Sequence, residues 1–361
     1  MYTRTQTKTI YIGGVPVGGG HPITVQSMTN TDTRDVSATI NQIQALVDAG
    51  CEIVRVAIPD MAAAKAFRDI KKAAPIPVVA DIHFDYRLAL AAIESGADKL
   101  RINPGNIAGG SGAGGESRVR QVAEAAKKAG IPIRVGVNGG SLEKALLKKY
   151  GGVTPEALCE SVINHVKMLE ACSFYDIALA IKASDVPLTL AAHRLLCEQV
   201  NYPLHVGITE AGTPYRGTIK SAVGIGALLA MGIGDTVRVS LTGDPVEEVR
   251  VAKEILQTMG LRRFGTQLIS CPTCGRCEVD LAAIAQKVEA FCDTLDAPIT
   301  VAVMGCVVNG PGEAREADFG IAAGVGQGVV FQKGQIVKKV PDDQLADALI
   351  DLISDWKATL N

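Results

Sequence analysis

The chain has 361 residues, more than a single hydrophobic core usually supports, so its length predicts one large domain and a smaller one. An apolar fraction of 47% with 4% aromatic residues and 38 glycines favours an aliphatic α/β protein with many tight turns, and excludes a disordered or fibrous chain. Lysine and arginine (36) nearly balance aspartate and glutamate (38), so no overall field attracts nucleic acid or an anionic membrane, and we expect small-molecule partners.

Short β-branched runs alternate with longer helical patterns from Ile23 onward. The preceding stretch TIYIGGVPVGGG predicts a small hairpin within residues 1–22. The eight predicted strands span residues 23–29, 52–58, 76–82, 99–105, 131–138, 176–184, 203–211 and 235–241. The segments between them have apolar residues three and four apart, as helices do. Eight β/α units in about 240 residues predict a closed (β/α)₈ TIM barrel rather than an open doubly wound sheet.

The pattern changes near Leu261, and residues 262–361 are typical of a smaller α+β domain. Its predicted order is the cysteine stretch CPTCGRC, a helix over 280–295, the stretch PITVAVMGCVVNGPGEA, two short strands around GIAAGVGQGVVFQKGQIV, and a final helix in DDQLADALIDLISDW. We therefore expect a barrel domain over residues 1–261 and a second domain over residues 262–361.

No targeting or membrane segment is predicted. The N-terminus has no apolar core of signal-peptide length, and no run reaches the roughly 18 apolar residues of a membrane span. The nine cysteines are sparse and odd in number, unlike the disulfide frameworks of small secreted domains. We expect a cytoplasmic protein with reduced thiols.

Cations recur near the carboxyl ends of the predicted strands, where barrel enzymes have their chemistry. Side chains alternate along a strand, so residues two or four apart share a face. The rule groups Asp81 with His83, Arg101 with Asn103, Arg134 with Asn138, Lys182 with Ser184, and Arg238 with Ser240, and Arg55 joins them from the second strand. Four arginines and a lysine at one mouth would repel one another unless an anion lay between them. A diphosphate is the best candidate, because guanidinium groups match phosphate oxygens.

The alternative is that these cations are ordinary interior or helix-facing residues, neutralised by Asp81, Asp185, Glu210 or one another. Any single cation fits either interpretation, whereas the repeated pattern on four strands favours an anion site for the set. Glu210, in HVGITEAG, fits two roles equally well: a general acid or base, or an ion-pair partner.

Three cysteines lie within seven residues at Cys271, Cys274 and Cys277. Followed by the remote Cys306, they have ferredoxin-like spacing, so spacing alone predicts an iron–sulfur cluster on these four, although Val307 replaces the proline of that motif. Zinc is an alternative that would need four of the five cysteines after residue 270, because all five histidines come earlier. A thioredoxin-type redox pair is less favoured, because no βαβ junction is predicted here.

The motifs CPTCGR and MGCVVNGPGEA, preceded by QSMTNTDT, RINPGN, KASD and HVGITEAG, resemble the 4-hydroxy-3-methylbut-2-enyl diphosphate synthase family over essentially the whole chain, in its compact two-domain bacterial form. The resemblance implies a [4Fe–4S] cluster held by Cys271, Cys274, Cys306 and Glu313. Cys277 would then be a bystander, with a four-cysteine arrangement as the competitor. The implied reaction is the reductive ring opening and dehydration of 2-C-methyl-D-erythritol 2,4-cyclodiphosphate in the non-mevalonate isoprenoid pathway.

For that substrate we expect roles for the whole predicted set. The diphosphate would be bound by Arg55, Arg101, Arg134, Lys182 and Arg238, with help from Asn103, Asn138, Ser184 and Ser240. Glu210 would handle the proton of the departing hydroxyl, and Asn309 would lie close to the cluster. The resemblance further implies a flavodoxin or ferredoxin electron donor and a homodimer in which the second domain of one subunit caps the barrel of the other. Two alternatives stay open: a zinc-bearing, methyltransferase-like barrel enzyme and a non-catalytic iron–sulfur redox sensor.

Overall fold

A computed structural model of the chain describes residues 4–109, 113–277, 279–306, 312 and 315–360. The chain folds into two compact units that divide between Arg262 and Arg263. Among the described residues, no helix combines the length and the apolar character needed to cross a membrane.

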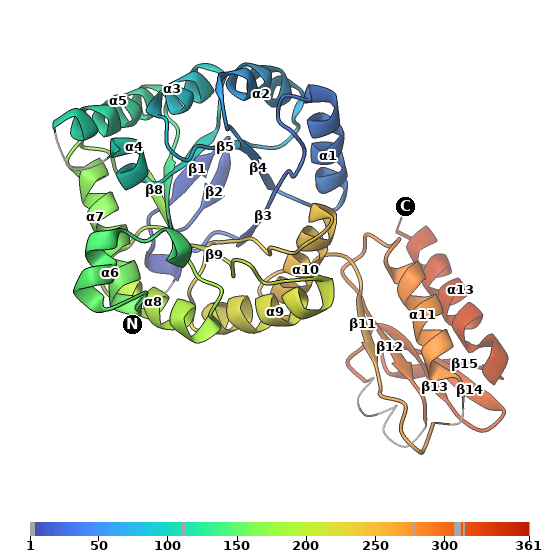
Figure 1. Cartoon of the computed structure of the whole chain (residues 1–361). Coiled ribbons are helices and arrows are strands. Elements are labelled where there is room, and N and C mark those ends of the chain that lie inside the picture. Colours follow the sequence, from blue (N-terminus) through green and yellow to red (C-terminus); the bar gives the residue numbers. More distant parts are fainter. Residues whose placement is uncertain (1–3, 110–112, 278, 307–311, 313–314, 361) are drawn as a thin grey trace. The chain divides into compact units, whose positions relative to one another are not determined.

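Eight parallel strands form the sheet of the first unit (Figure 1). Their order is β8-β7-β6-β5-β4-β3-β10-β9, and a bridge between Leu179 and Leu204 joins the two ends of the sheet. The strands are β3 (Thr24–Met28), β4 (Ile53–Ala57), β5 (Val78–Asp81), β6 (Lys99–Ile102), β7 (Ile133–Asn138), β8 (Ile177–Lys182), β9 (His205–Val206) and β10 (Thr236–Val237). The predicted TIM barrel is confirmed. β9 and β10 are shorter than predicted, with two residues each.

Helices surround the barrel sheet (Figure 1). They are α1 (Val36–Asp48), α2 (Met61–Ala73), α3 (Tyr86–Glu94), α4 (Pro104–Ala108), α5 (Ala113–Ala129), α6 (Lys144–Tyr150), α7 (Pro155–Glu170), α8 (Val186–Cys197), α9 (Pro214–Ala230) and α10 (Pro245–Thr258). Single 3₁₀ turns are η1 (Arg4–Gln6) and η2 (Gly139–Ser141). Five of the loops end in an aspartate whose carboxylate accepts a hydrogen bond from the first turn of the helix, at Asp35, Asp60, Asp85, Asp185 and Asp244. Each such cap stabilises its helix by about 1 kcal/mol, so these acids serve helices rather than the cations of the barrel.

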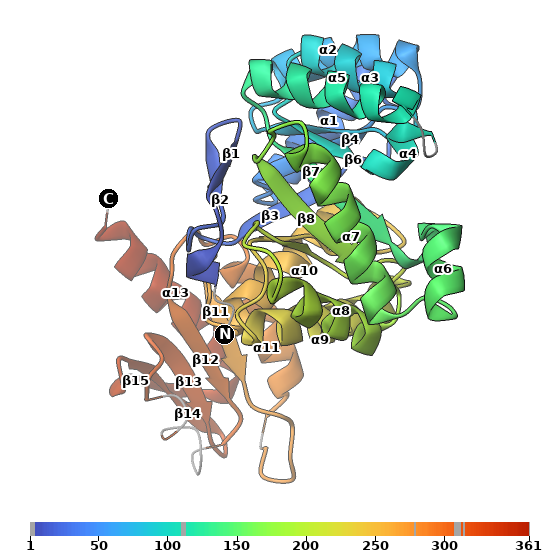
Figure 2. The same ribbon diagram turned by 90° about the vertical axis from the view of Figure 1, so that its left-hand side faces the viewer.

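The predicted hairpin, β1 (Ile10–Ile12) and β2 (Val15–Val17), closes one end of the barrel. Its tight turn is made by Gly13 and Gly14, which have φ angles of 53° and 89° that favour glycine. The apolar side chains of the hairpin pack against Ile53, Val79 and Ala178 from three barrel strands. Figure 2 shows the hairpin at the end of the barrel opposite α4 and α6.

Replacing Ile12 by alanine should lower the free energy of unfolding by about 2–5 kcal/mol, because Ile12 is 0% exposed within this apolar cluster. Denaturant unfolding of the full chain measures the change. Tyr11→Ala is the matched control, since Tyr11 is the next residue on the same strand but is 61% exposed. Equal effects of the two substitutions would contradict the conclusion that the hairpin closes the barrel through its buried apolar side chains.

The second unit has a five-stranded sheet in the order β11-β12-β13-β14-β15. Its strands are β11 (Gln267–Ser270), β12 (Thr300–Met304), β13 (Phe319–Ala323), β14 (Gln327–Gln332) and β15 (Gln335–Pro341). The first three are parallel and the last two antiparallel. Helices α11 (Leu281–Cys292) and α13 (Leu345–Ala358), the latter after η3 (Asp342–Gln344), pack on one face through a shared apolar core. The predicted α+β architecture is confirmed, but the prediction missed β11 and gave two strands where the glycine-rich region forms three. β11 is a short edge strand with no buried side chain, so it has no alternating apolar pattern.

Candidate functional site

The five predicted cations come together in the barrel. Arg55, Arg101, Arg134 and Lys182 are buried side chains of β4, β6, β7 and β8, and Arg238, directly after β10, is partly buried. Burial lowers the pKa of Lys182 well below its usual value, and the positive charges of the four arginines lower it further. The arrangement is a ring of mutually repelling cations, called the cation ring below.

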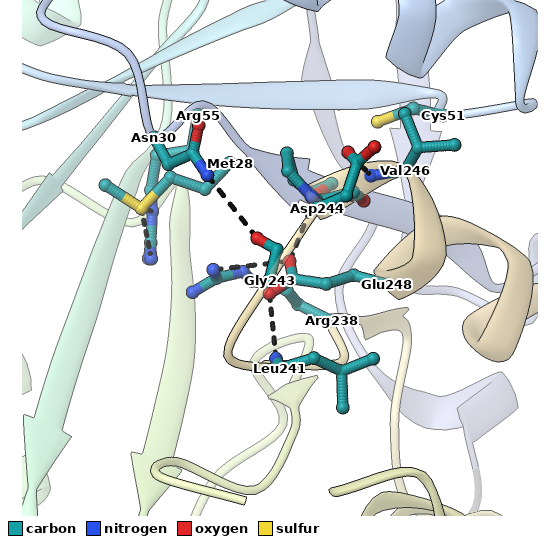
Figure 3. A network of polar contacts seen from close by, with 12 residues as sticks. Met28, Asn30, Cys51, Arg55, Arg238, Leu241, Gly243, Asp244, Val246 and Glu248 are labelled. Carbon is teal, nitrogen blue, oxygen red and sulfur yellow. Dashed lines mark hydrogen bonds and ion pairs between the residues drawn. The ribbon is translucent and has the colours of Figure 1, made fainter. Parts of the chain in front are cut away.

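Two carboxylates oppose the ring in the described part of the barrel. Asp81 lies between Arg101, at 2.9 Å, and Arg55, at 3.4 Å. Burial alone would raise the pKa of Asp81, but these two guanidinium groups hold it at about 2. Glu248, on α10, lies 3.4 Å from Arg238 and accepts a hydrogen bond from the backbone N–H of Leu241 at 2.9 Å. Figure 3 shows Glu248 with Arg238 and Leu241, and Arg55, which donates to the sulfur of Met28.

The ring keeps buried donors without acceptors. Arg134 and Lys182 form no ion pair among the described residues. The Nε and one terminal nitrogen of Arg134, and the Nε atoms of Arg101 and Arg238, are buried without a hydrogen-bond partner in the described part of the chain. Burial and the neighbouring arginines lower the pKa of Arg134 well below its usual value. Buried unpaired charges and donors are costly, so the ring is built to receive an anion with several oxygen acceptors.

Sequence reasoning missed residues next to the ring. Lys99 is 1% exposed and its Nζ donates to the side-chain oxygen of Gln26 at 3.4 Å. Neither ring nitrogen of the buried His205 has a hydrogen-bond partner among the described residues. The alternation rule could have found Lys99, which is two residues before Arg101 on β6. Glu248 had no such signal, because it reaches the barrel from a helix.

The predicted polar residues near the cations differ from one another in burial. Asn103 is buried and its side-chain oxygen accepts from the N–H of Asn106 at 3.3 Å, which caps α4. Asn138 and Ser240 are partly buried, whereas Ser184 and Glu210 are exposed. Their contacts with substrate stay predictions.

Glu210 has a φ of 52°, an uncommon conformation for a residue with a side chain. It forms no ion pair with the ring among the described residues, and Asp185 caps α8. Of the three acids considered from sequence, only Asp81 neutralises the ring. Together these three acids therefore do not neutralise the positive charge of the ring, as the alternative interpretation requires.

The cysteines gather at one edge of the second sheet. Cys271 directly follows β11 and Cys306 follows β12 by two residues, and parallel strands end at the same edge. The backbone N–H of Gly305 donates to the sulfur of Cys271 at 3.1 Å. Cys274 is exposed, and its pKa is lowered by hydrogen bonds from the backbone and side chain of Arg276. These thiols are free in the structure and suit a thiolate-binding metal centre.

Cys277 differs from its neighbours. Its thiol donates to the carbonyl oxygen of Val279 at 3.3 Å, and its sulfur is 2.7 Å from where a Cβ atom at Gly305 would lie. The predicted residues Asn309 and Glu313 lie outside the described residues. No three donors among the described His, Cys, Asp and Glu side chains are already arranged around one metal position. The cysteines thus fit a metal centre by the chemistry of their thiols and by their position at one edge of the sheet.

Comparison with known families matches both units. The family model described as the GcpE TIM-barrel domain matches residues 7–253, and the GcpE protein C-terminal domain matches residues 267–355. A 4-hydroxy-3-methylbut-2-en-1-yl diphosphate synthase (flavodoxin) from Geobacter sulfurreducens is 60% identical over 347 residues, covering 96% of this chain and 97% of that protein. The enzyme of the same name from Ruminiclostridium cellulolyticum is 58% identical over 352 residues, covering 98% of each chain.

Similarity to solved structures concerns the fold alone. Dihydropteroate synthase from Stenotrophomonas maltophilia has a TM-score of 0.50 at 13% identity, covering 70% of this chain and 98% of that one. N-acetylneuraminic acid synthetase from Leptospira borgpetersenii has the same TM-score and identity, covering 79% of this chain and 96% of that one.

Replacing Arg134 by methionine should stabilise the protein in the absence of an anion, by about 1–4 kcal/mol, because it removes a buried and unpaired charge. The same change should weaken the binding of inorganic pyrophosphate by at least about tenfold. Denaturant unfolding and titration calorimetry measure the two effects. Arg68→Met, an exposed position on α2, is the control and should leave both nearly unchanged. A destabilised R134M protein with normal pyrophosphate affinity would contradict an anion site.

Proposed function

Because this chain belongs to the 4-hydroxy-3-methylbut-2-en-1-yl diphosphate synthase family, we propose that it catalyses the reductive ring opening and dehydration of 2-C-methyl-D-erythritol 2,4-cyclodiphosphate to 4-hydroxy-3-methylbut-2-enyl diphosphate. This is an oxidoreductase step of the non-mevalonate isoprenoid pathway. The observation that carries the proposal is the cation ring, which has buried donors without acceptors and a strong excess of positive charge. A compact diphosphate supplies both the negative charge and the oxygen acceptors that such a ring needs. The zinc enzyme and the redox sensor are not favoured by the relatives.

The diphosphate is proposed to bind Arg55, Arg101, Arg134, Lys182 and Arg238, with Asn103, Asn138, Ser184 and Ser240 at the strand ends. The positions of the cations support this proposal. Arg55, Arg101, Arg134 and Lys182 belong to strands that the ladder hydrogen bonds hold rigidly. Such preorganised charge is the main means by which enzymes stabilise developing charge. Asp81 fixes Arg55 and Arg101 without cancelling the charge of the ring.

Opening the ring and losing the hydroxyl as water takes up two electrons and a proton. The relatives carry the word flavodoxin in their names, and we propose flavodoxin or ferredoxin as the electron donor. Cys271, Cys274, Cys306 and Glu313 are proposed to hold a [4Fe–4S] cluster, with Asn309 nearby; such a cluster, when bound, transfers electrons one at a time. The hydrogen bond from the backbone N–H of Gly305 to the sulfur of Cys271 links the ends of β11 and β12, near which Cys271 and Cys306 lie. A homodimer is proposed from the family resemblance.

Replacing Cys306 by serine should remove most of the bound iron and sulfide, whereas replacing Cys277 by serine should retain both. The reason is that the Cys277 thiol donates a hydrogen bond to the carbonyl oxygen of Val279 and packs beside Gly305. Mössbauer spectroscopy with iron and sulfide analysis, on protein purified without oxygen, measures this. We expect one iron to differ from the others, as a carboxylate ligand requires. Four equivalent irons together with cluster loss in C277S would show Cys277 to be the fourth ligand, and zinc without sulfide would overturn the cluster.

Replacing Glu210 by glutamine should lower kcat by about a hundredfold or more, because it removes a general acid or base but leaves the cation ring intact. Steady-state turnover of the cyclodiphosphate with reduced flavodoxin measures kcat, and pyrophosphate affinity is the control for an intact ring. Unchanged turnover in E210Q would remove Glu210 from the mechanism.

A further inference from the structure

A carboxylate and an imidazole form a partly buried pair outside the cation ring. His165, on α7, has a side chain only 4% exposed, and its Nε2 lies 2.9 Å from a carboxylate oxygen of Glu143. The hydroxyl of Ser161, one turn earlier on α7, donates to both oxygens of Glu143, at 3.0 and 2.8 Å. Burial would raise the pKa of Glu143, but the hydrogen bonds from His165 and Ser161 hold it at about 2. The carboxylate is therefore charged and held in one orientation.

The imidazole of this pair supports the segment that follows β6. A Cβ atom on Gly105 would lie 2.6 Å from Nε2 of His165 and 3.3 Å from the side-chain oxygen of Asn103. The ring thus packs directly on the first turn of α4, at the residue where only glycine leaves room. Asn103 caps that turn with its oxygen, which leaves its Nδ2 donors for another partner.

The carboxylate of the pair belongs to the segment that follows β7. Only η2 and Leu142 separate Glu143 from Asn138, the last residue of β7. A single side chain of α7, His165, therefore joins two neighbouring loops at the carboxyl ends of β6 and β7. The first loop begins at Asn103, a proposed substrate-binding residue, whereas Asn138 precedes the second loop and is still paired with Lys182 in the strand ladder.

We propose that Glu143 and His165 are positioning residues for substrate binding, which hold the loop of Asn103 in place without contacting the substrate. The inference rests on the proposed function. Side chains on loops need such support, because a binding residue displaced by about 1 Å loses much of its contribution. The ring cations on β4, β6, β7 and β8 need less, since the strand ladder already places them.

The test uses the full-length enzyme with its cluster reconstituted. Glu143→Gln keeps the shape of the side chain but removes its negative charge, so the hydrogen bonds that it accepts from His165 and Ser161 lose their charge assistance. We expect KM for the cyclodiphosphate to rise about tenfold while kcat changes less than about twofold. Thermal unfolding is followed in parallel. A lowered melting temperature with an unchanged KM would overturn the proposal, because it would show a role in stability alone.

Glu160→Gln is the matched control. Glu160 is also on α7 and also joins that helix to α6, through Lys149 at 2.6 Å, but it does not contact Gly105 or Asn103. Its KM should equal that of the unmodified enzyme. An equal rise of KM in E160Q would overturn the inference, since any link between α6 and α7 would then have the same effect.

A double-mutant cycle tests the contact with Gly105. Gly105→Ala should raise KM, because the added methyl group displaces the imidazole, and His165→Ala should raise it by losing the support. The double variant should be no worse than the more affected single variant, because one contact is lost once. Additive effects would overturn the coupling.

Pyrophosphate affinity separates this inference from the proposed function. If the unmodified enzyme does not turn over the cyclodiphosphate, the proposed function fails, and the pair is then tested by calorimetry alone. Glu143→Gln should weaken pyrophosphate binding about tenfold in that experiment. Unchanged affinity in E143Q would overturn the inference even where the function holds.

Discussion

Burying a guanidinium or ammonium group costs several kcal/mol unless an anion replaces the lost water. The barrel interior buries several such groups. Arg55, Arg101, Arg134, Lys182 and Lys99 are all buried, and Arg238 is nearly so. Asp81 and Glu248 are the only carboxylates that pair with them among the described residues. The fold therefore carries a large unfavourable electrostatic energy that is released when an anion binds, and its hydrophobic packing must compensate for that energy in the free protein.

The architecture maintains this imbalance in two ways. The hairpin closes the amino end of the barrel with apolar side chains, so that end offers the cations no polar partner from the hairpin strands. The acids near the mouth are mostly committed elsewhere, since Asp85, Asp185 and Asp244 accept hydrogen bonds from the first turns of their helices. A capping aspartate stays oriented along its helix, where the macrodipole also favours its charge. The positive field consequently persists even though the chain as a whole is nearly neutral.

The barrel could be predicted from the sequence because each of its units repeats the same signal, a β-branched run followed by an amphipathic helix. The cations of the ring were found by alternation along single strands, which needs no tertiary information. Glu248 could not be found in that way, because its approach to Arg238 depends on how α10 packs on the barrel. β11 was missed for a similar reason: it is an edge strand whose pairing with β12, rather than its own pattern, makes it a strand. Local periodicity thus predicts which side chains of a strand share a face, and not which side chains of a neighbouring element contact them.

The same distinction explains why the site needs support outside the ring. Arg101 and Arg134 are paired directly across β6 and β7, so the sheet hydrogen bonds that shape the barrel also set the distance between them. Asn138 is the last residue of β7 and is still paired with Lys182, whereas Asn103 lies directly beyond β6, in a loop that the ladder does not hold. Glu143 and His165 are placed at this boundary, with one group in a loop and the other on α7. A barrel that binds its ligand with both strand and loop residues requires two kinds of positioning. Strand residues are positioned by the hydrogen-bond ladder, which follows from local sequence. Loop residues are positioned only by contacts between elements far apart in the chain.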